Sequence, residues 1–474
     1  MSTEKFIKNK TALITLIAAC LVVLLSLSVR QVFGMFFMDF NRDLGITNTE
    51  FGLAIGIQML GWGLSGPIFG AISDKYGGHK AISLAFLFYI AGIYLLFSGP
   101  NTGIYFQISL GVLIGIGCGG TAISIPMAVV GKHFPLSTRT IAMSFVTAVG
   151  SFGYFLSPIF TNYSLQNYGW VQTLIYFMFF LIAGLAISYF VRSPSTNQST
   201  EAADNQSSIS ALKEAFKTKS YVLLISGFFV CGFHITLVGT HVPTYVIDRG
   251  LESWTAAAIL SLIGLFNIFG SLLSGYLSTK MKKKVILSAL YTLRGISICL
   301  FIFLPASNIN AFIFGASFGF LWLSTVPATS GIVAHIFGSL FSGYLSTKMK
   351  KKVILAAIYT LRGISICLFI FLPASNINAF IFGASFGFLW LSTVPATSGI
   401  VAQMFGTKHL GMLYGIVFLS HQIGSFFGSF LGGLFHDIYG SYDYAWYLAI
   451  ALSIFAAIIH VPIKEEPVLR LKTE

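Results

Sequence analysis

Apolar runs of about twenty residues recur along almost the whole chain, and they constrain the fold more than any other feature. A helix needs roughly 20 apolar residues to cross the ~30 Å hydrocarbon core of a bilayer. Only 9% of the 474 residues are charged, whereas roughly 25% are charged in a soluble domain. An ordinary globular protein is therefore excluded, and we predict an all-α integral membrane protein.

Fourteen spans are predicted from runs that charged or turn residues bound. They lie at 11–38, 51–72, 81–98, 104–130, 142–160, 171–191, 220–246, 255–278, 285–304, 309–334, 353–372, 377–402, 409–431 and 444–463. Residues 192–219 are polar and end in a short amphipathic helix near 211–216, which indicates a linker. We expect a six-helix bundle at 1–191, this cytoplasmic linker, a second bundle at 220–463 and a cytoplasmic tail at 464–474.

The basic residues predict how the spans are oriented. If the N-terminus is cytoplasmic, strict alternation puts 23 of the 28 Lys and Arg inside, three within spans, and only Arg42 and Arg249 outside. This distribution follows the positive-inside rule. We therefore expect a multi-pass protein of the cell (inner) membrane with both termini cytoplasmic. The net charge of +13 is then a topology signal, and no nucleic-acid partner is expected.

One segment of the chain is present twice. Residues 268–334 recur at 336–402 with an offset of 68, and the copies differ only at Leu273/Phe341, Ser288/Ala356 and Leu290/Ile358. So few differences indicate a recent tandem duplication or an assembly error in the sequence, not an ancient repeat array. The extra copy adds an even number of crossings, so the later spans keep their orientation.

The loop between the second and third spans carries the most specific motif, GAISDKYGGHK at residues 70–80. Gly70 permits close helix approach, Gly77 a tight turn, and Asp74 can bind a helix N-terminus or a basic side chain. With Lys75 and Lys80, these residues resemble the loop signature of the major facilitator superfamily. The resemblance implies a two-bundle transporter of about 14 spans, twelve plus a duplicated helical hairpin. The alternative is a simple positive-inside loop.

Arg30 lies inside the first span, because eight largely apolar residues beginning with Gln31 still follow it. An unpaired charge there costs on the order of 2.5 to 3.5 kcal/mol or more. A guanidinium offers a planar fork matched to a carboxylate, so Arg30 is predicted to bind an anion in a central aqueous cavity. Snorkelling to the outer interface, or pairing with Asp39 or Asp43, is the alternative.

Three intramembrane histidines are further candidates. His234 and His241 lie seven residues apart, on one helix face to within about 20°, and His421 precedes Gln422 in a later span. Imidazoles can relay a proton or hold an anion. A packing role for each histidine remains open.

A second group of polar residues has weaker support. Arg294 and its copy Arg362 each lie ten residues past a cytoplasmic lysine, about 15 Å into the membrane. One of them is predicted to bind substrate or brace the cytoplasmic gate. Asn267, Gln58, Gln31 and Gln422 are also candidates for substrate binding, although uncharged amides often only join helices.

Motifs in the second half narrow the resemblance. CGFH at 231–234, WLSTVP at 322–327, and SHQ at 420–422 followed by GG at 432–433, Asp437 and GSY at 440–442 resemble a prokaryotic branch near the monocarboxylate porters. This resemblance implies a proton-linked symporter of small organic anions that works by alternating access. Arg30 would then pair with the substrate carboxylate, a histidine would carry the proton, and Asp74 would latch the outward-facing form. We expect a monomer in the lipid bilayer without cofactor or metal.

Two other functions remain possible on the same scaffold. One is export of amphipathic compounds. The other is a non-transporting or inactive membrane protein whose symmetry the duplication has broken. An enzyme has little support, because no HExxH spacing and no Ser/His/Asp or Cys/His arrangement is recognisable.

Overall fold

The computed structural model describes residues 10–134, 136–193, 208–248, 252–262, 360, 363–371, 400–401, 404–405, 410–460, 462–464 and 466–468. Within these ranges the regular structure is helical and contains no strand. Asn267, Arg294 and Arg362 lie outside the described residues, as do the first copy of the duplicated segment and most of the second.

The N-terminal half forms the helices α2 to α9. Their bounds are α2 Lys10–Gln31, the 3-10 turn η1 Phe33–Phe36, α3 Phe37–Leu44, α4 Asn48–Tyr76, α5 Gly78–Ser98, α6 Gly103–Phe106, the π-helical η2 Gln107–Leu113, α7 Ile114–Thr121, α8 Ser124–His133 and α9 Leu136–Ser188. The predicted fourth span is therefore not one regular helix, and α9 combines two predicted spans. Its chain turns at Gly169, whose φ of 76° favours glycine.

The described part of the C-terminal half begins with α10 Ser208–Lys217 and continues with α11 Lys219–Asp248, α19 Leu410–Tyr439 and α20 Asp443–His460. A shorter apolar helix spans Ser253–Leu262. Seven helices in the described ranges are long and apolar enough to cross a membrane. The helical membrane architecture predicted from the sequence is confirmed, whereas the count of fourteen spans stays a prediction.

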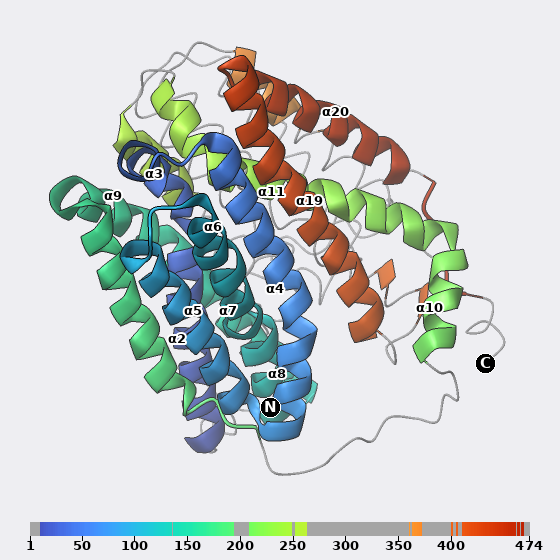
Figure 1. The fold of residues 1–474 in the computed structure, drawn as a ribbon. Coiled ribbons are helices and arrows are strands. Elements are labelled where there is room, and N and C mark those ends of the chain that lie inside the picture. The colour runs from blue at the N-terminus through green and yellow to red at the C-terminus, as the bar shows by residue number, and fades with distance from the viewer. Residues whose placement is uncertain are drawn as a thin grey trace, which may run out of the picture.

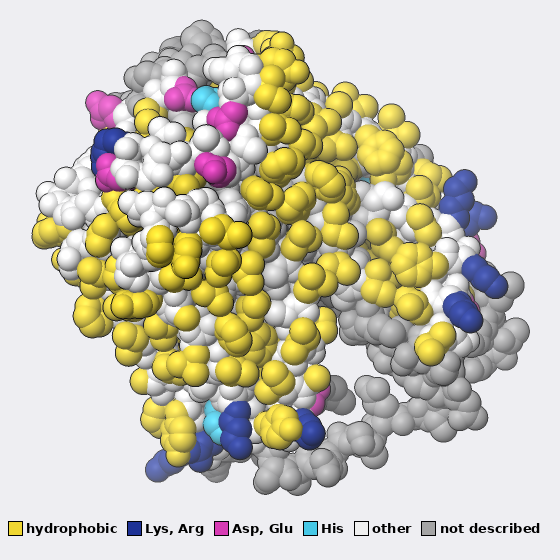
Figure 2. All heavy atoms as spheres, in the orientation of Figure 1, with side chains coloured by type: hydrophobic (Ala, Val, Ile, Leu, Met, Phe, Trp, Pro, Cys, Tyr) yellow, Lys and Arg dark blue, Asp and Glu magenta, His cyan; other side chains and the backbone are white. Residues whose placement is uncertain are grey.

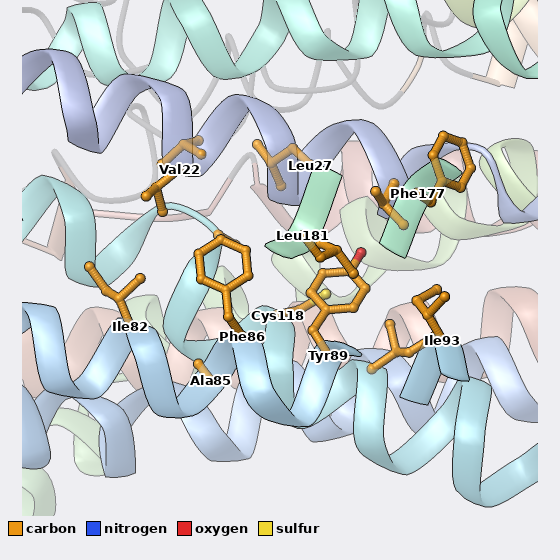
Figure 3. Close-up of a cluster of buried hydrophobic side chains, with 14 of the residues drawn as sticks. Val22, Leu27, Ile82, Ala85, Phe86, Tyr89, Ile93, Cys118, Phe177 and Leu181 are labelled. Atoms are coloured by element: carbon orange, nitrogen blue, oxygen red, sulfur yellow. The ribbon is translucent and has the colours of Figure 1, made fainter. Parts of the chain in front are cut away.

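Each half has its own hydrophobic core. In the N-terminal half, side chains of α2, α5, α7 and α9 meet around Phe86 and Tyr89 (Figure 3). The Tyr89 hydroxyl, fully buried, donates to the Ser26 carbonyl at 3.2 Å, which satisfies its polar end. The second core gathers α11, α20 and part of α19 around Trp446. Figure 1 shows the two groups of helices side by side, with α4 and α19 between them.

The two ends of the bundle differ in charge. We call one the acidic end, which carries Asp39, Asp43, Glu50, Asp248 and Asp437, and the other the basic end, which carries Lys75, Lys80, Lys132, Arg192 and Lys217. In Figure 2, magenta side chains gather at the top of the visible face, and dark blue ones at the bottom and at the far right. The helices run between these two ends.

Candidate functional site

The two halves meet where α4 crosses α19, and small residues make the contact. We call this contact the seam; it joins Asn48–Gly63 of α4 to Gln422–Gly433 of α19. A Cβ added at Gly56 would lie 2.7 Å from the Phe426 ring, and one at Gly52 or Gly433 would run into backbone of the opposite helix. Glycines therefore let the two backbones touch.

The seam does not extend to the basic end. Just beyond the seam, Trp62 contacts Phe418 across the halves, with ring centroids 6.1 Å apart. One turn further along α19, a Cβ added at Gly415 would meet no described residue within 4 Å. Figure 1 shows α4 and α19 diverging toward their lower, basic ends. The structure is therefore closed at the acidic end, and these two helices part below the level of Trp62.

A cavity of ≈ 20 Å³ lies between the halves. Its walls come from α2 and η1, from α4 and from α11: Arg30, Gln31, Phe33, Gly34, Ile55, Gln58, Met59, Ile235, Thr236, Gly239 and Thr240. Three predicted substrate-binding residues from two helices, Arg30, Gln31 and Gln58, thus line one cavity. Trp62, which contacts Arg30, stands midway along the 29-residue helix α4, so the Arg30 guanidinium lies near mid-depth.

Arg30 is held by neutral groups. Its Nη2 donates to the Met59 sulfur at 3.0 Å, its guanidinium carbon lies 4.7 Å from the centroid of the Trp62 ring, and the Tyr154 side chain lies nearby. Among the described residues no carboxylate lies within 4 Å of Arg30. The guanidinium is therefore oriented by neutral neighbours, and no described acid pairs with it.

The acids that could have paired with Arg30 bind another arginine. Asp39 and Asp43 form ion pairs with Arg42 at 2.8 and 2.6 Å, and the indole of Trp170 also donates to Asp43. Pairing of Arg30 with either acid is therefore not what the structure shows. Nor does Arg30 reach the outer interface, because its contacts lie at mid-depth, between the helices.

Three donors at this cavity have no partner among the described residues. Arg30 Nε, Gln31 Nε2 and Thr236 Oγ1 are buried there without a hydrogen bond. A buried unpaired donor costs roughly 1 to 3 kcal/mol, so three of them around one cavity indicate a site that a polar ligand or water fills. Gln58 differs, because its amide donates to the Leu110 carbonyl within the π-helical turn at 3.0 Å. It joins two helices of the N-terminal half.

The predicted histidine pair points away from the cavity. His234 Nε2 donates to the Ala449 carbonyl of α20 at 2.8 Å, and His241 Nε2 to the Ser429 carbonyl of α19 at 2.7 Å. Both rings are buried, at 0% and 1% exposure. The two histidines, seven residues apart, do share a helix face, but this face packs inside the C-terminal half. Neither imidazole lines the Arg30 cavity.

His421 lies closer to the mid-depth site. Its ring stacks on Phe418 with centroids 5.7 Å apart, and Phe418 in turn meets Trp62, the residue that lies against Arg30. The Nδ1 atom of His421 is 3.2 Å from Gln422 Oε1, and the Gln422 Nε2 atom is buried with no hydrogen-bond partner in the part of the chain that the structure describes. The structure thus brings His421 and Gln422 to the seam beside the Arg30 site, but not into the cavity lining.

The loop motif predicted as a latch lies at the basic end. Asp74 forms an ion pair of 2.7 Å with Lys132, which belongs to the same half, and Lys75 lies over the Tyr76 ring. Gly77 ends α4 with a φ of 95°. A Cβ at Gly70 would meet only Ile125 at 3.9 Å, so this conformation does not need a glycine there. Lys80, in the first turn of α5, completes the motif.

Several residues of the site escaped the sequence analysis: Met59, Trp62, Tyr154, Thr236 and Phe418. All are apolar or weakly polar, so their types are ordinary in a membrane helix. One signal was available, because Gln58 and Trp62 are four residues apart and share a helix face. In the described ranges, no group of three His, Cys, Asp or Glu is placed to hold a metal ion.

Comparison with known proteins decides the family. The model of the Major Facilitator Superfamily matches residues 19–338 and 321–473. The chain belongs to this superfamily. It is a multi-pass membrane transporter and not an enzyme.

Relatives of this transporter include proteins whose names give different substrates. It is 23% identical to the sialic acid transporter NanX of Escherichia coli over 64% of this chain and 80% of that protein. It is also 23% identical to monocarboxylate transporter 13 of Rattus norvegicus, over 66% of this chain and 72% of that protein. The MFS-type transporter YcxA of Bacillus subtilis is 22% identical over 88% of this chain and 86% of its own length.

Proposed function

We propose that this transporter moves a small, monocarboxylate-like organic anion by alternating access, coupled to protons. The observation that carries the proposal is the Arg30 guanidinium, which lies between the halves at mid-depth without a carboxylate partner among the described residues. A charge kept at this depth needs an anion to stabilise it. Relatives that carry sialic acid and, by name, monocarboxylates support an anionic substrate.

The described conformation is one stage of the proposed cycle. A cavity of ≈ 20 Å³ has room for about one water molecule and not for an organic acid. The substrate therefore reaches Arg30 when the walls of the cavity, α2 and α4 on one side and α11 on the other, move apart. By the positive-inside rule the basic end is cytoplasmic, so this conformation is closed toward the outside.

The proton is proposed to act beside Arg30. His234 and His241 are occupied with backbone carbonyls, so His421 is the histidine best placed, one aromatic pair away from the guanidinium. When an anion and a proton enter together, the cavity gains no net charge. That lowers the free-energy cost of enclosing the loaded site in apolar surroundings while the protein changes conformation.

Replacement of Arg30 tests the substrate. In proteoliposomes with an inward proton gradient, Arg30→Gln is expected to lower the initial uptake of labelled lactate and related acids by roughly 10- to 100-fold, because a charge-assisted bidentate pair is lost. Arg30→Lys should fall between Gln and the parent, since lysine keeps the charge but not the fork.

Arg42→Gln is the matched control, because Arg42 is an exposed arginine of the same half already paired with acids. Its uptake should equal that of the parent. Saturable uptake that survives Arg30→Gln undiminished refutes the proposal. Movement of cationic dyes in place of acids by the parent chain would favour the exporter.

A further inference from the structure

Two segments of the chain share one spacing of glycine and aspartate. Residues 70–77 read GAISDKYG and residues 433–440 read GLFHDIYG, so each has Gly, Asp four residues later, and Gly three residues after that. The first ends α4 at the basic end, and the second ends α19 at the acidic end. Gly77 and Gly440 both have positive φ, 95° and 68°. The second segment is thus the counterpart of the loop motif at the opposite end.

Asp437, the acid of the second segment, hydrogen-bonds residues of the other half. Asp437 Oδ1 accepts from the Asn48 side-chain amide at 2.8 Å, and Oδ2 accepts from the Thr49 backbone N–H at 2.7 Å. Asn48 and Thr49 form the first turn of α4, where backbone N–H groups have no partner within the helix. This turn also carries the positive end of the helix dipole. A carboxylate of the C-terminal half therefore caps a helix of the N-terminal half.

Neighbouring groups complete the contact around Asn48, which is only 8% exposed. The Tyr442 hydroxyl donates to Asn48 Oδ1 at 2.6 Å, and His436 Nδ1 lies 2.9 Å from Asn48 Nδ2. His436 Nε2 in turn lies 3.4 Å from Asp248 of α11. Three residues of the C-terminal half, Asp437, Tyr442 and His436, thus hold one asparagine of α4. The bonds to Asn48 must break before the acidic end can open, whereas the contact of His436 with Asp248 lies within the C-terminal half.

We propose that Asp437, with Asn48 and the Thr49 N–H, forms a latch that closes the acidic end of the transport route. Asp437 is a positioning residue that never meets the substrate; it stabilises the conformation in which the seam is shut. The inference rests on the proposed alternating access but not on the identity of the cargo. It assigns to the second segment the task predicted for Asp74, at the opposite end and for the opposite conformation.

Distances between spin labels measure the latch without any substrate. We would label Asn101, in an exposed loop of the N-terminal half, and Tyr444, exposed at the start of α20, in full-length protein whose five native cysteines are replaced. In proteoliposomes, Asp437→Asn is expected to raise the ratio of long to short distances about tenfold, as befits the loss of a charge-assisted bond. Asn48→Ala should do the same from the other half, and the double variant should add little.

Asp443→Asn is the matched control, because it removes an acid at the same end that begins α20 of its own half. Its distances should equal those of the parent. Unchanged distances in both Asp437→Asn and Asn48→Ala, in protein that elutes as the parent does, would overturn the latch. If the distances shift while no organic acid is taken up, the latch stands and only the proposed cargo is refuted.

Discussion

The two Gly-Asp-Gly segments have one spacing and two different environments. Asp74 at the basic end is 73% exposed on its side chain and pairs with a lysine of its own half, whereas Asp437 at the acidic end binds the first turn of a helix from the other half. The spacing fixes the turn, since both glycines have positive φ. Whether the acid joins the halves depends on whether the N-terminus of a helix from the other half lies beside it. In this conformation that partner is present only at the acidic end, among the described residues.

A larger side chain in the seam is expected to have the largest effect on the ratio of open to closed forms at the acidic end. A Cβ at Gly433 would run into the Asn48 carbonyl, next to the latch, and no flexible side chain is there to move aside. Gly433→Ala should therefore cost the closed form ~1 to 3 kcal/mol, which shifts the ratio of open to closed distances by roughly 5- to 160-fold. The spin-label pair at Asn101 and Tyr444 measures this ratio.

Gly415→Ala controls for the change in helix propensity. Gly415 lies on the same helix with open space around an added Cβ, and alanine stabilises a helix interior by ~1 kcal/mol relative to glycine. This variant should melt at or above the temperature of the parent and keep its distances. Equal behaviour of the two alanine variants would show that the seam does not close the acidic end.

The sequence predicts the bundle better than the site. Apolar runs locate the helices because the bilayer fixes their length, and a buried charge identifies Arg30 because its cost is large. Trp62 and Phe418 are in contact although they are 356 residues apart in sequence, and no local sequence pattern predicts that contact. Likewise, the spacing of His234 and His241 gives a shared face but does not say that this face packs against α19 and α20.

Removing one hydroxyl from the latch should have a smaller effect than overpacking the seam. Tyr442→Phe keeps the ring that packs on His241 and His436 but loses the donor to Asn48 Oδ1. A neutral hydrogen bond contributes ~0.5 to 1.5 kcal/mol, so the open-to-closed ratio should rise about twofold to tenfold. In the Asp437→Asn background the same change should do less, because Asn48 is already released. An equal effect in both backgrounds would show that Tyr442 acts outside the latch.

Neutralising the acid at the basic end should change the described conformation least. The Asp74 and Lys132 side chains are 73% and 44% exposed, and exposed ion pairs contribute ~0 to 1 kcal/mol. Asp74→Asn should therefore leave the distances at the acidic end unchanged or shorten them, because the expected role of Asp74 is to stabilise the opposite conformation. Combined with Asp437→Asn, it should move the open-to-closed ratio back toward that of the parent. An increase in the open form with Asp74→Asn alone would mean that the two segments support the same conformation, and the mirrored roles assigned to them would be wrong.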